Sequence, residues 1–144
     1  MRTGKENFVL GAISLVSNEL NTFGEVCLEE ITFKQWFLLM MISKMEKGEK
    51  SVNLIADFTG TSRQNVKKML TPLEKKGFVS ITGSENDGRA LSVELTDKTY
   101  KYFFDHDGRI AKATERLFSA FSDAELDLFA MSFKKLIAAL DEEK

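Results

Sequence analysis

The apolar residues of this chain change their spacing once, near Gly77, and that change limits the folds open to it. Between Ser62 and Gly77 they recur at steps of three and four residues, as on one face of a helix, at Val66, Met69, Leu70 and Leu73. Beyond Gly77 they suit two short strands: residues 78–81, then residues 90–95, which place Leu91, Val93 and Leu95 on one face and Ser92 and Glu94 on the other. The turn-rich sequence GSENDG separates these strands, so we expect a helix followed directly by a β-hairpin.

Three further helices are expected before that pair of elements. The first has an apolar face made of Phe8, Val9, Ala12, Ile13, Val16, Leu20 and Phe23. The second begins at a capping box, Thr32 with Gln35, and is apolar on most sides. The third is short, and we expect Ser51 to cap it, Gly60 to end it, and three residues to form its buried face, namely Leu54, Ile55 and Phe58.

Two helices are expected after the hairpin. Thr96 can cap a long helix whose apolar stripe is Tyr100, Phe103, Phe104, Ile110, Ala111, Thr114, Leu117 and Phe118. A second capping box, Ser122 with Glu125, begins the last helix, with a stripe at Leu126, Phe129, Phe133, Leu136 and Leu140. Little in the neighbouring sequence could cover the stripes of the terminal helices. A second copy of the chain is the simplest cover, so we expect a homodimer.

The fold class predicted from this order is mainly α with a small β-hairpin. Two short helices joined by a tight Gly-containing turn, at residues 51–77, resemble a helix-turn-helix, whose second helix enters the DNA major groove. On that helix Gln64 and Asn65 suit adenine edges, and Arg63 suits guanine. Thr61 and Ser62 can contact bases or phosphate, while lysines attract phosphate, at Lys67 and Lys68. The alternative is that these side chains form an ordinary solvated face.

Charge is unevenly distributed along the chain. The 144 residues include 22 acidic and 20 basic side chains, a net charge of −2. Between Thr61 and Arg89 there are six basic residues and three acidic ones, a net charge of +3, which leaves −5 for the rest. The basic residues are Arg63, Lys67, Lys68, Lys75, Lys76 and Arg89. Positive charge is therefore concentrated where binding to DNA needs it.

The hairpin loop can contribute as a wing. An arginine near its tip, Arg89, is suited to the DNA minor groove. In the alternative interpretation the loop is a surface turn in which Asp87 pairs with Arg89.

Several classes of protein are disfavoured. The single cysteine, Cys27, allows no internal disulfide and fits a reducing compartment, and the amino terminus does not resemble a signal peptide. The longest apolar run, Trp36 to Ile42, is too short to cross a bilayer, so we expect a cytoplasmic protein. With one histidine, His106, and no nucleophile–base pair or phosphate loop, we expect no metal site, no cofactor and no enzymatic activity.

The residues in this order resemble the MarR family of winged helix-turn-helix regulators. The resemblance covers nearly the whole chain and rests on three phrases: ITFKQWFLLMMI (31–42), SVNLIADFTGTSRQNVKKMLTPLEKKGFV (51–79) and NDGRALSVELTDK (86–98). It implies a single chain, 1–144, with a DNA-binding part at 32–96 and a helical dimerisation part at 1–31 and 97–144. It also implies terminal helices that interlock between two copies.

The resemblance further implies binding to palindromic double-stranded DNA, as a repressor, and a small-molecule or redox signal. By position it assigns the recognition helix to Ser62, Arg63, Gln64, Asn65, Lys67 and Lys68, and the wing to Asp87 and Arg89. A small aromatic effector would suit the family, although the sequence does not identify one. A competing function is a winged-helix protein-interaction module that does not bind an operator.

Some residues depart from the pattern or remain open. Pro72 lies deep in the recognition helix, where it removes a hydrogen bond and should kink the helix. Cys27 is expected to be a buried or loop cysteine; sensing is disfavoured by the acidic residues around it, which oppose a thiolate. Asp107 could contact an effector or lie at a hydrogen-bonded kink.

Overall fold

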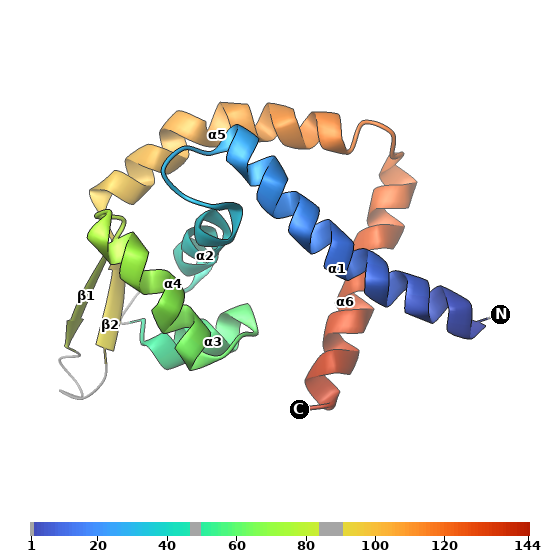
Figure 1. Ribbon diagram of the computed structural model, residues 1–144, viewed down its shortest axis with the longest axis horizontal. Coiled ribbons are helices and arrows are strands. Elements are labelled where there is room, and N and C mark those ends of the chain that lie inside the picture. Colours follow the sequence, from blue (N-terminus) through green and yellow to red (C-terminus); the bar gives the residue numbers. More distant parts are fainter. Residues whose placement is uncertain (1, 47–49, 84–90) are drawn as a thin grey trace. The chain divides into compact units, whose positions relative to one another are not determined.

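The computed structural model describes residues 2–46, 50–83 and 91–144, and the chain divides into two compact units, Met1–Gly108 and Arg109–Lys144. The first unit contains five complete elements after the first helix, and the fifth helix continues from it into the second unit (Figure 1). In chain order the elements are α1 (Arg2–Cys27), α2 (Phe33–Lys44), α3 (Val52–Thr59), α4 (Arg63–Lys75), β1 (Val79–Gly83), β2 (Leu91–Leu95), α5 (Asp97–Leu117) and α6 (Asp123–Glu142). The predicted order and the mainly helical fold class are confirmed.

Polar side chains begin four of the helices where the sequence predicted them. Both capping boxes are formed: in the first, the Gln35 amide nitrogen donates to Thr32 Oγ1 (3.1 Å) and the Thr32 amide donates to Gln35 Oε1 (3.0 Å). The second joins Ser122 to Glu125 in the same way. Ser51 and Ser62 cap α3 and α4 through one side-chain bond each. These caps satisfy backbone donors that have no partner inside the helix, so they fix where each helix begins.

The turn between α3 and α4 depends on Gly60, which has the left-handed backbone angle φ 71° that glycine adopts without strain. The Thr61 amide then donates to the carbonyl of Ala56 (3.1 Å), which closes the turn. The inward stripe of α4 is buried as predicted at Val66, Leu70 and Leu73, with Met69 partly exposed.

The predicted buried face of α3 is wrong at two of its three residues. Ile55 is fully buried, but Leu54 is 53% exposed and Phe58 is 47% exposed. The core side of this eight-residue helix consists of Val52, Ile55 and Ala56. The helix therefore packs on the core through these three residues, and its larger apolar residues Leu54 and Phe58 lie outside that buried face.

The hairpin has the predicted strands, but the predicted alternation fails in β2. The strands pair antiparallel, from Val79 with Leu95 to Gly83 with Leu91. Ser92 is buried rather than exposed, because it also forms an isolated bridge with Ser51. The Val93 amide donates to the carbonyl of Lys50 (2.8 Å), so a short segment before α3 pairs with β2 beside the hairpin.

Phe78 lies at the centre of the first unit's core, between α4 and β1. Its side chain is completely buried and meets the ring of Tyr102 edge-on, with centroids 5.4 Å apart and an interplanar angle of 83°. The other fully buried side chains of this core are Leu39, Ile42, Ile55, Val66, Leu70, Leu73, Val93 and Thr99. They come from α2, α3, α4, β2 and α5, so one core positions the helix-turn-helix and the hairpin together.

The apolar stripes of the terminal helices remain largely exposed in a single chain. On α1 Phe8 is 74% exposed, and on α5 Phe104 is 85% exposed. Within α6, all of which the structure describes, no residue is buried. The buried face of α5 in the first unit is formed by Thr99 and Tyr102 instead of the predicted stripe. Among residues 2–46, 50–83 and 91–144, no helix combines the length and apolarity needed for a bilayer crossing.

The burial of Phe78 yields a stability prediction. We expect Phe78→Ala to lower the free energy of unfolding by about 3–5 kcal/mol, because it removes buried apolar surface and leaves a cavity. The matched control is Phe58→Ala, whose half-exposed ring should cost only about 1 kcal/mol. Urea unfolding followed by circular dichroism measures both. Equal losses for the two variants would contradict the assignment of Phe78 to the core.

Candidate nucleic-acid interface

The outward side of α4 carries a continuous set of polar side chains, here called the α4 polar face: Arg63, Gln64, Asn65, Lys67 and Lys68. All five are exposed, while Val66 and Leu70 on the inward side of the helix are buried. The side chains of Arg63, Gln64, Lys67 and Lys68 have no hydrogen bond or ion pair with another described residue. The face is therefore backed by a rigid core, and its long side chains can reach an external partner.

The amino-terminal end of α4 is organised by local hydrogen bonds. Ser62 Oγ accepts from the Asn65 amide nitrogen (3.1 Å), and Asn65 Nδ2 donates to Thr61 Oγ1 (2.9 Å). The backbone N–H groups of Arg63 and Gln64 come before the first intrahelical donor, so they have no partner within the helix. Together with the helix dipole, such donors favour a phosphate oxygen at this end of α4.

The carboxyl-terminal end of α4 is closed by a Schellman motif. Gly77 has φ 83°, its amide donates to the carbonyl of Glu74 (3.0 Å), and the Phe78 amide donates to the carbonyl of Leu73 (2.9 Å). Pro72 lies inside α4 and cannot donate to the carbonyl of Lys68, yet the helix continues without a break to Lys75. The predicted kink itself stays untested.

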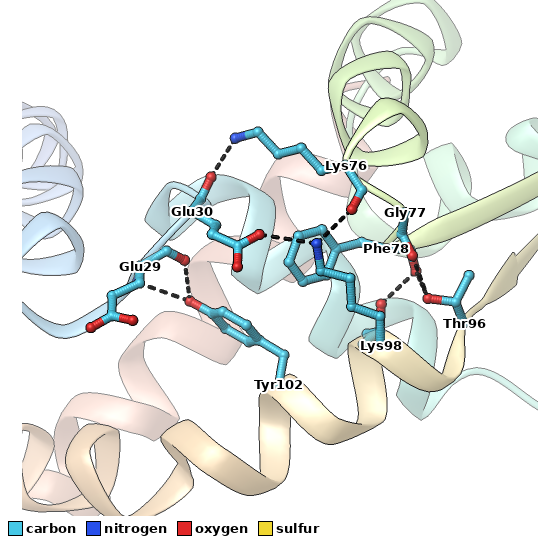
Figure 2. Close-up of polar contacts among 9 residues, drawn as sticks. Glu29, Glu30, Lys76, Gly77, Phe78, Thr96, Lys98 and Tyr102 are labelled. Carbon is cyan, nitrogen blue, oxygen red and sulfur yellow. Dashed lines mark hydrogen bonds and ion pairs between the residues drawn. The ribbon is translucent and has the colours of Figure 1, made fainter.

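Lys76 does not belong with the polar face, although the sequence counted its charge there. Its Nζ donates to the backbone carbonyl of Glu30, in the loop after α1 (Figure 2). Beside it, Lys98 Nζ, from the first turn of α5, donates to Glu30 Oε2 (3.0 Å) and to the Lys76 carbonyl (2.7 Å). We call Glu30, Lys76 and Lys98 the Glu30 cluster.

No pattern in the sequence singles out the Glu30 cluster. Its members are distant in the chain and follow no spacing rule, and Lys98 is simply the last residue of the phrase NDGRALSVELTDK. Thr96 was expected to cap α5, but its hydroxyl donates to the carbonyl of Gly77 (2.6 Å). The buried Thr99 hydroxyl donates to the carbonyl of Phe78. The start of α5 is therefore bonded directly to the chain that leaves α4.

The predicted wing residues lie outside the part of the chain that the structure describes. β1 ends at Gly83 and β2 begins at Leu91, and the two residues pair with each other. Asp87 and Arg89 fall between them, in residues 84–90, so their assignment remains a prediction.

The remaining candidates offer no second site. Cys27 is buried at the end of α1, as expected of a structural cysteine. Asp107 is exposed, while its neighbour His106 stacks on Tyr102, with ring centroids 3.9 Å apart. Within the described ranges, no three His, Cys, Asp or Glu residues are grouped so that they could hold a metal ion.

Comparison with known sequences places this geometry in a family. A family model described as "MarR family" matches residues 30–90, from the loop after α1 to the residue before β2. The transcriptional repressor MprA of Escherichia coli is 31% identical over 83 residues, which are 58% of this chain and 47% of that protein. An HTH-type transcriptional regulator of Bacillus subtilis, YfiV, is 33% identical over 99 residues, or 69% of this chain and 61% of YfiV. The chain thus matches less than two thirds of either relative.

Solved structures share the fold along almost the entire chain. A MarR/EmrR family regulator from Acinetobacter sp. ADP1 superposes with a TM-score of 0.79 at 21% identity, covering 95% of this chain and 97% of that one. MepR of S. aureus, solved as a complex with DNA, has a TM-score of 0.79 at 21% identity, covering 90% and 95%. PcaV of Streptomyces coelicolor, solved with its natural ligand, has a TM-score of 0.77 at 15% identity, covering 90% and 91%. These similarities establish the winged helix-turn-helix architecture.

The hydrogen bond at the start of α4 yields a second prediction. Ser62→Ala should lower the free energy of unfolding by about 1 kcal/mol, because it removes the acceptor of the Asn65 amide. Ser62→Gly is the matched control and should cost only about a few tenths of a kcal/mol, since glycine is tolerated at this position. Urea unfolding compares the two variants. An Ala variant as stable as the wild type would show that the cap does not hold α4.

Proposed function

We propose, from the premise that this chain belongs to the MarR family, that it is a dimeric, sequence-specific repressor that binds a palindromic operator and is released by a signal. It acts in the cytoplasm by binding rather than by catalysis. The DNA-binding part is 32–96, and the dimerisation part is 1–31 with 97–144. Thr61, Asp87 and Arg89 complete the proposed DNA contacts beside Ser62 and the α4 polar face.

The α4 polar face is the observation that carries this proposal. Amide and guanidinium groups at Arg63, Gln64 and Asn65 match the hydrogen-bonding edges of guanine and adenine. Lys67 and Lys68 stand exposed beside them, as phosphate contacts require. The competing function, a protein-interaction module without operator binding, gives no reason for cations and amides to gather on this helix. The complex of the related MepR with DNA supports the first interpretation.

Exposed apolar stripes support the dimer. Phe8 on α1, Phe104 on α5 and Phe129 on α6 each leave a large part of an aromatic ring in solvent in the single chain. Covering these side chains with a second copy would remove apolar surface from water. A two-fold dimer would also present two α4 polar faces, about 34 Å apart, to successive major-groove half-sites.

A signal that releases the repressor is the least specified part of the proposal. The named ligand complex of PcaV and the regulation of Bordetella bronchiseptica BpsR by 6-hydroxynicotinic acid support a small aromatic effector. Burial of Cys27 argues against a redox signal at that thiol.

Selection from random DNA duplexes tests the function. The wild-type protein should enrich an inverted repeat whose half-site centres lie about one helical turn apart. Gln64→Ala should weaken binding to the enriched sequence by about 1–3 kcal/mol and relax the preference at one position of each half-site. Its binding to scrambled duplexes should stay unchanged. An enriched sequence without a dyad, or no enrichment at all, would count against an operator-binding dimer.

Lys67 should show the different signature of a phosphate contact. Lys67→Ala should weaken binding to all duplexes and reduce the slope of log K against log salt by about 0.9 per lost contact. Lys101→Ala is the control, because Lys101 is also exposed but pairs with Asp105 one turn along α5 (2.8 Å). That hydrogen bond and the charge of Asp105 raise the pKa of Lys101. Equal salt slopes for the wild type and Lys67→Ala would show that Lys67 does not contact a phosphate.

A further inference from the structure

We propose that Lys98 and Glu30 are positioning residues for DNA recognition, which hold the carboxyl-terminal end of α4 against α5 and the loop after α1 without touching DNA. This inference rests on the proposed function, and it assigns to two residues outside the helix-turn-helix a role in sequence preference. Figure 2 shows how Glu30, Lys76 and Lys98 converge from three separate segments of the chain.

The position of Lys98 is the first argument. It is the second residue of α5, where the helix dipole disfavours a cation. Its amine reaches back to the opposite kind of end: it donates to the carbonyl of Lys76, the C-cap residue that follows α4, where the dipole favours a cation. The same amine lies 4.5 Å from the ring centroid of Phe78 and forms an ion pair with Glu30. Lys98 therefore binds a carbonyl at the carboxyl-terminal end of α4, although it belongs to the first turn of α5.

The backbone of Glu30 is the second argument. It has φ 66°, which is a left-handed backbone angle. For any residue other than glycine, this angle is unfavourable in free energy. The Ile31 amide donates to the Glu29 carbonyl (2.7 Å), which makes a γ-turn centred on Glu30, and γ-turns with positive φ are rare and strained. Such a turn persists only where its surroundings determine it.

The contacts around this turn are what determine it. The Tyr102 hydroxyl donates to the Glu29 carbonyl (2.6 Å) and accepts from the Glu29 amide (3.1 Å). On the other side Lys76 binds the Glu30 carbonyl and Lys98 binds its carboxylate. The turn thus joins the end of α1, the end of α4 and the first turns of α5.

Contacts with base edges and contacts with phosphates act over different distances, so a shift of α4 should affect them differently. Base edges are read by hydrogen bonds that fail beyond about 3.2 Å, whereas phosphates attract cations over a screening length of about 8 Å. A helix rises 1.5 Å per residue, so a small tilt at Lys76 displaces side chains at the other end of α4. Loosening the Glu30 cluster should therefore reduce sequence preference more than general affinity.

Lys98→Met tests the inference, because it keeps the aliphatic stem and removes the amine. The ratio of affinities for the selected and a scrambled duplex should fall by about 3- to 10-fold, the scale of one exposed ion pair with a cation–π contact. The salt slope should stay unchanged, since no phosphate contact is lost. Lys98→Arg should restore the ratio, and Lys101→Met should not alter it.

Glu30→Gly separates positioning from electrostatics and from stability. It removes a negative charge, which by itself would tighten binding to any DNA, and it places glycine at a left-handed angle, which relieves strain. A positioning role predicts instead a lower ratio of affinities for the selected and the scrambled duplex. The midpoint of thermal unfolding should be equal to or above that of the wild type.

Four results decide between the outcomes. An unchanged ratio in Lys98→Met would overturn the inference alone, as would a slope reduced by about 0.9, which would make Lys98 a phosphate contact. If the wild type itself prefers no sequence, the proposed function fails. Hydrogen exchange at the Gly77 and Phe78 amides of the free protein then decides whether the cluster holds α4. Faster exchange in Lys98→Met but not in Lys101→Met supports that role, and equal exchange overturns it.

Discussion

Burial of Phe78 is the interaction on which the rest of the structure depends. The residue follows the Schellman turn of α4 directly, and its ring fills the core between α4, β1 and Tyr102 of α5. Its carbonyl accepts from Thr96, just before α5, and from Thr99 in the first turn of α5. One side chain and its peptide groups therefore set where α4 ends, where the hairpin begins and where α5 starts. The outward polar face has a defined position only because this inward contact is fixed.

Stability and recognition make opposite demands on α4. Its inward residues Val66, Leu70 and Leu73 are fully buried, while four outward side chains have no intramolecular partner among the described residues, at Arg63, Gln64, Lys67 and Lys68. An exposed polar face contributes little to folding, so its orientation has to be determined elsewhere, by the core beneath it and by contacts at its two ends. Ser62 fixes one end and Gly77 the other.

Local rules predicted most of this fold from the sequence. The caps at Thr32, Ser51, Ser62 and Ser122 were readable because capping depends on residues three apart. The exposure of Leu54, the burial of Ser92 and the hydroxyl bond of Thr96 were not, because each depends on a segment that only the fold brings near. The polar face could be predicted as a set of residues, but its free side chains could be distinguished from engaged ones only in the structure.

Lysine illustrates why a count of charges overstates an interface. The sequence assigns Lys67 and Lys76 alike to a basic segment, but the amine of Lys67 is free while that of Lys76 binds the Glu30 carbonyl. Lys98 lies outside the segment and yet contacts its end. A lysine bound within the protein adds long-range potential without a direct phosphate contact, whereas its removal disturbs geometry. Position within the fold, more than the local net charge, therefore determines which cations can bind DNA and which can only align those that do.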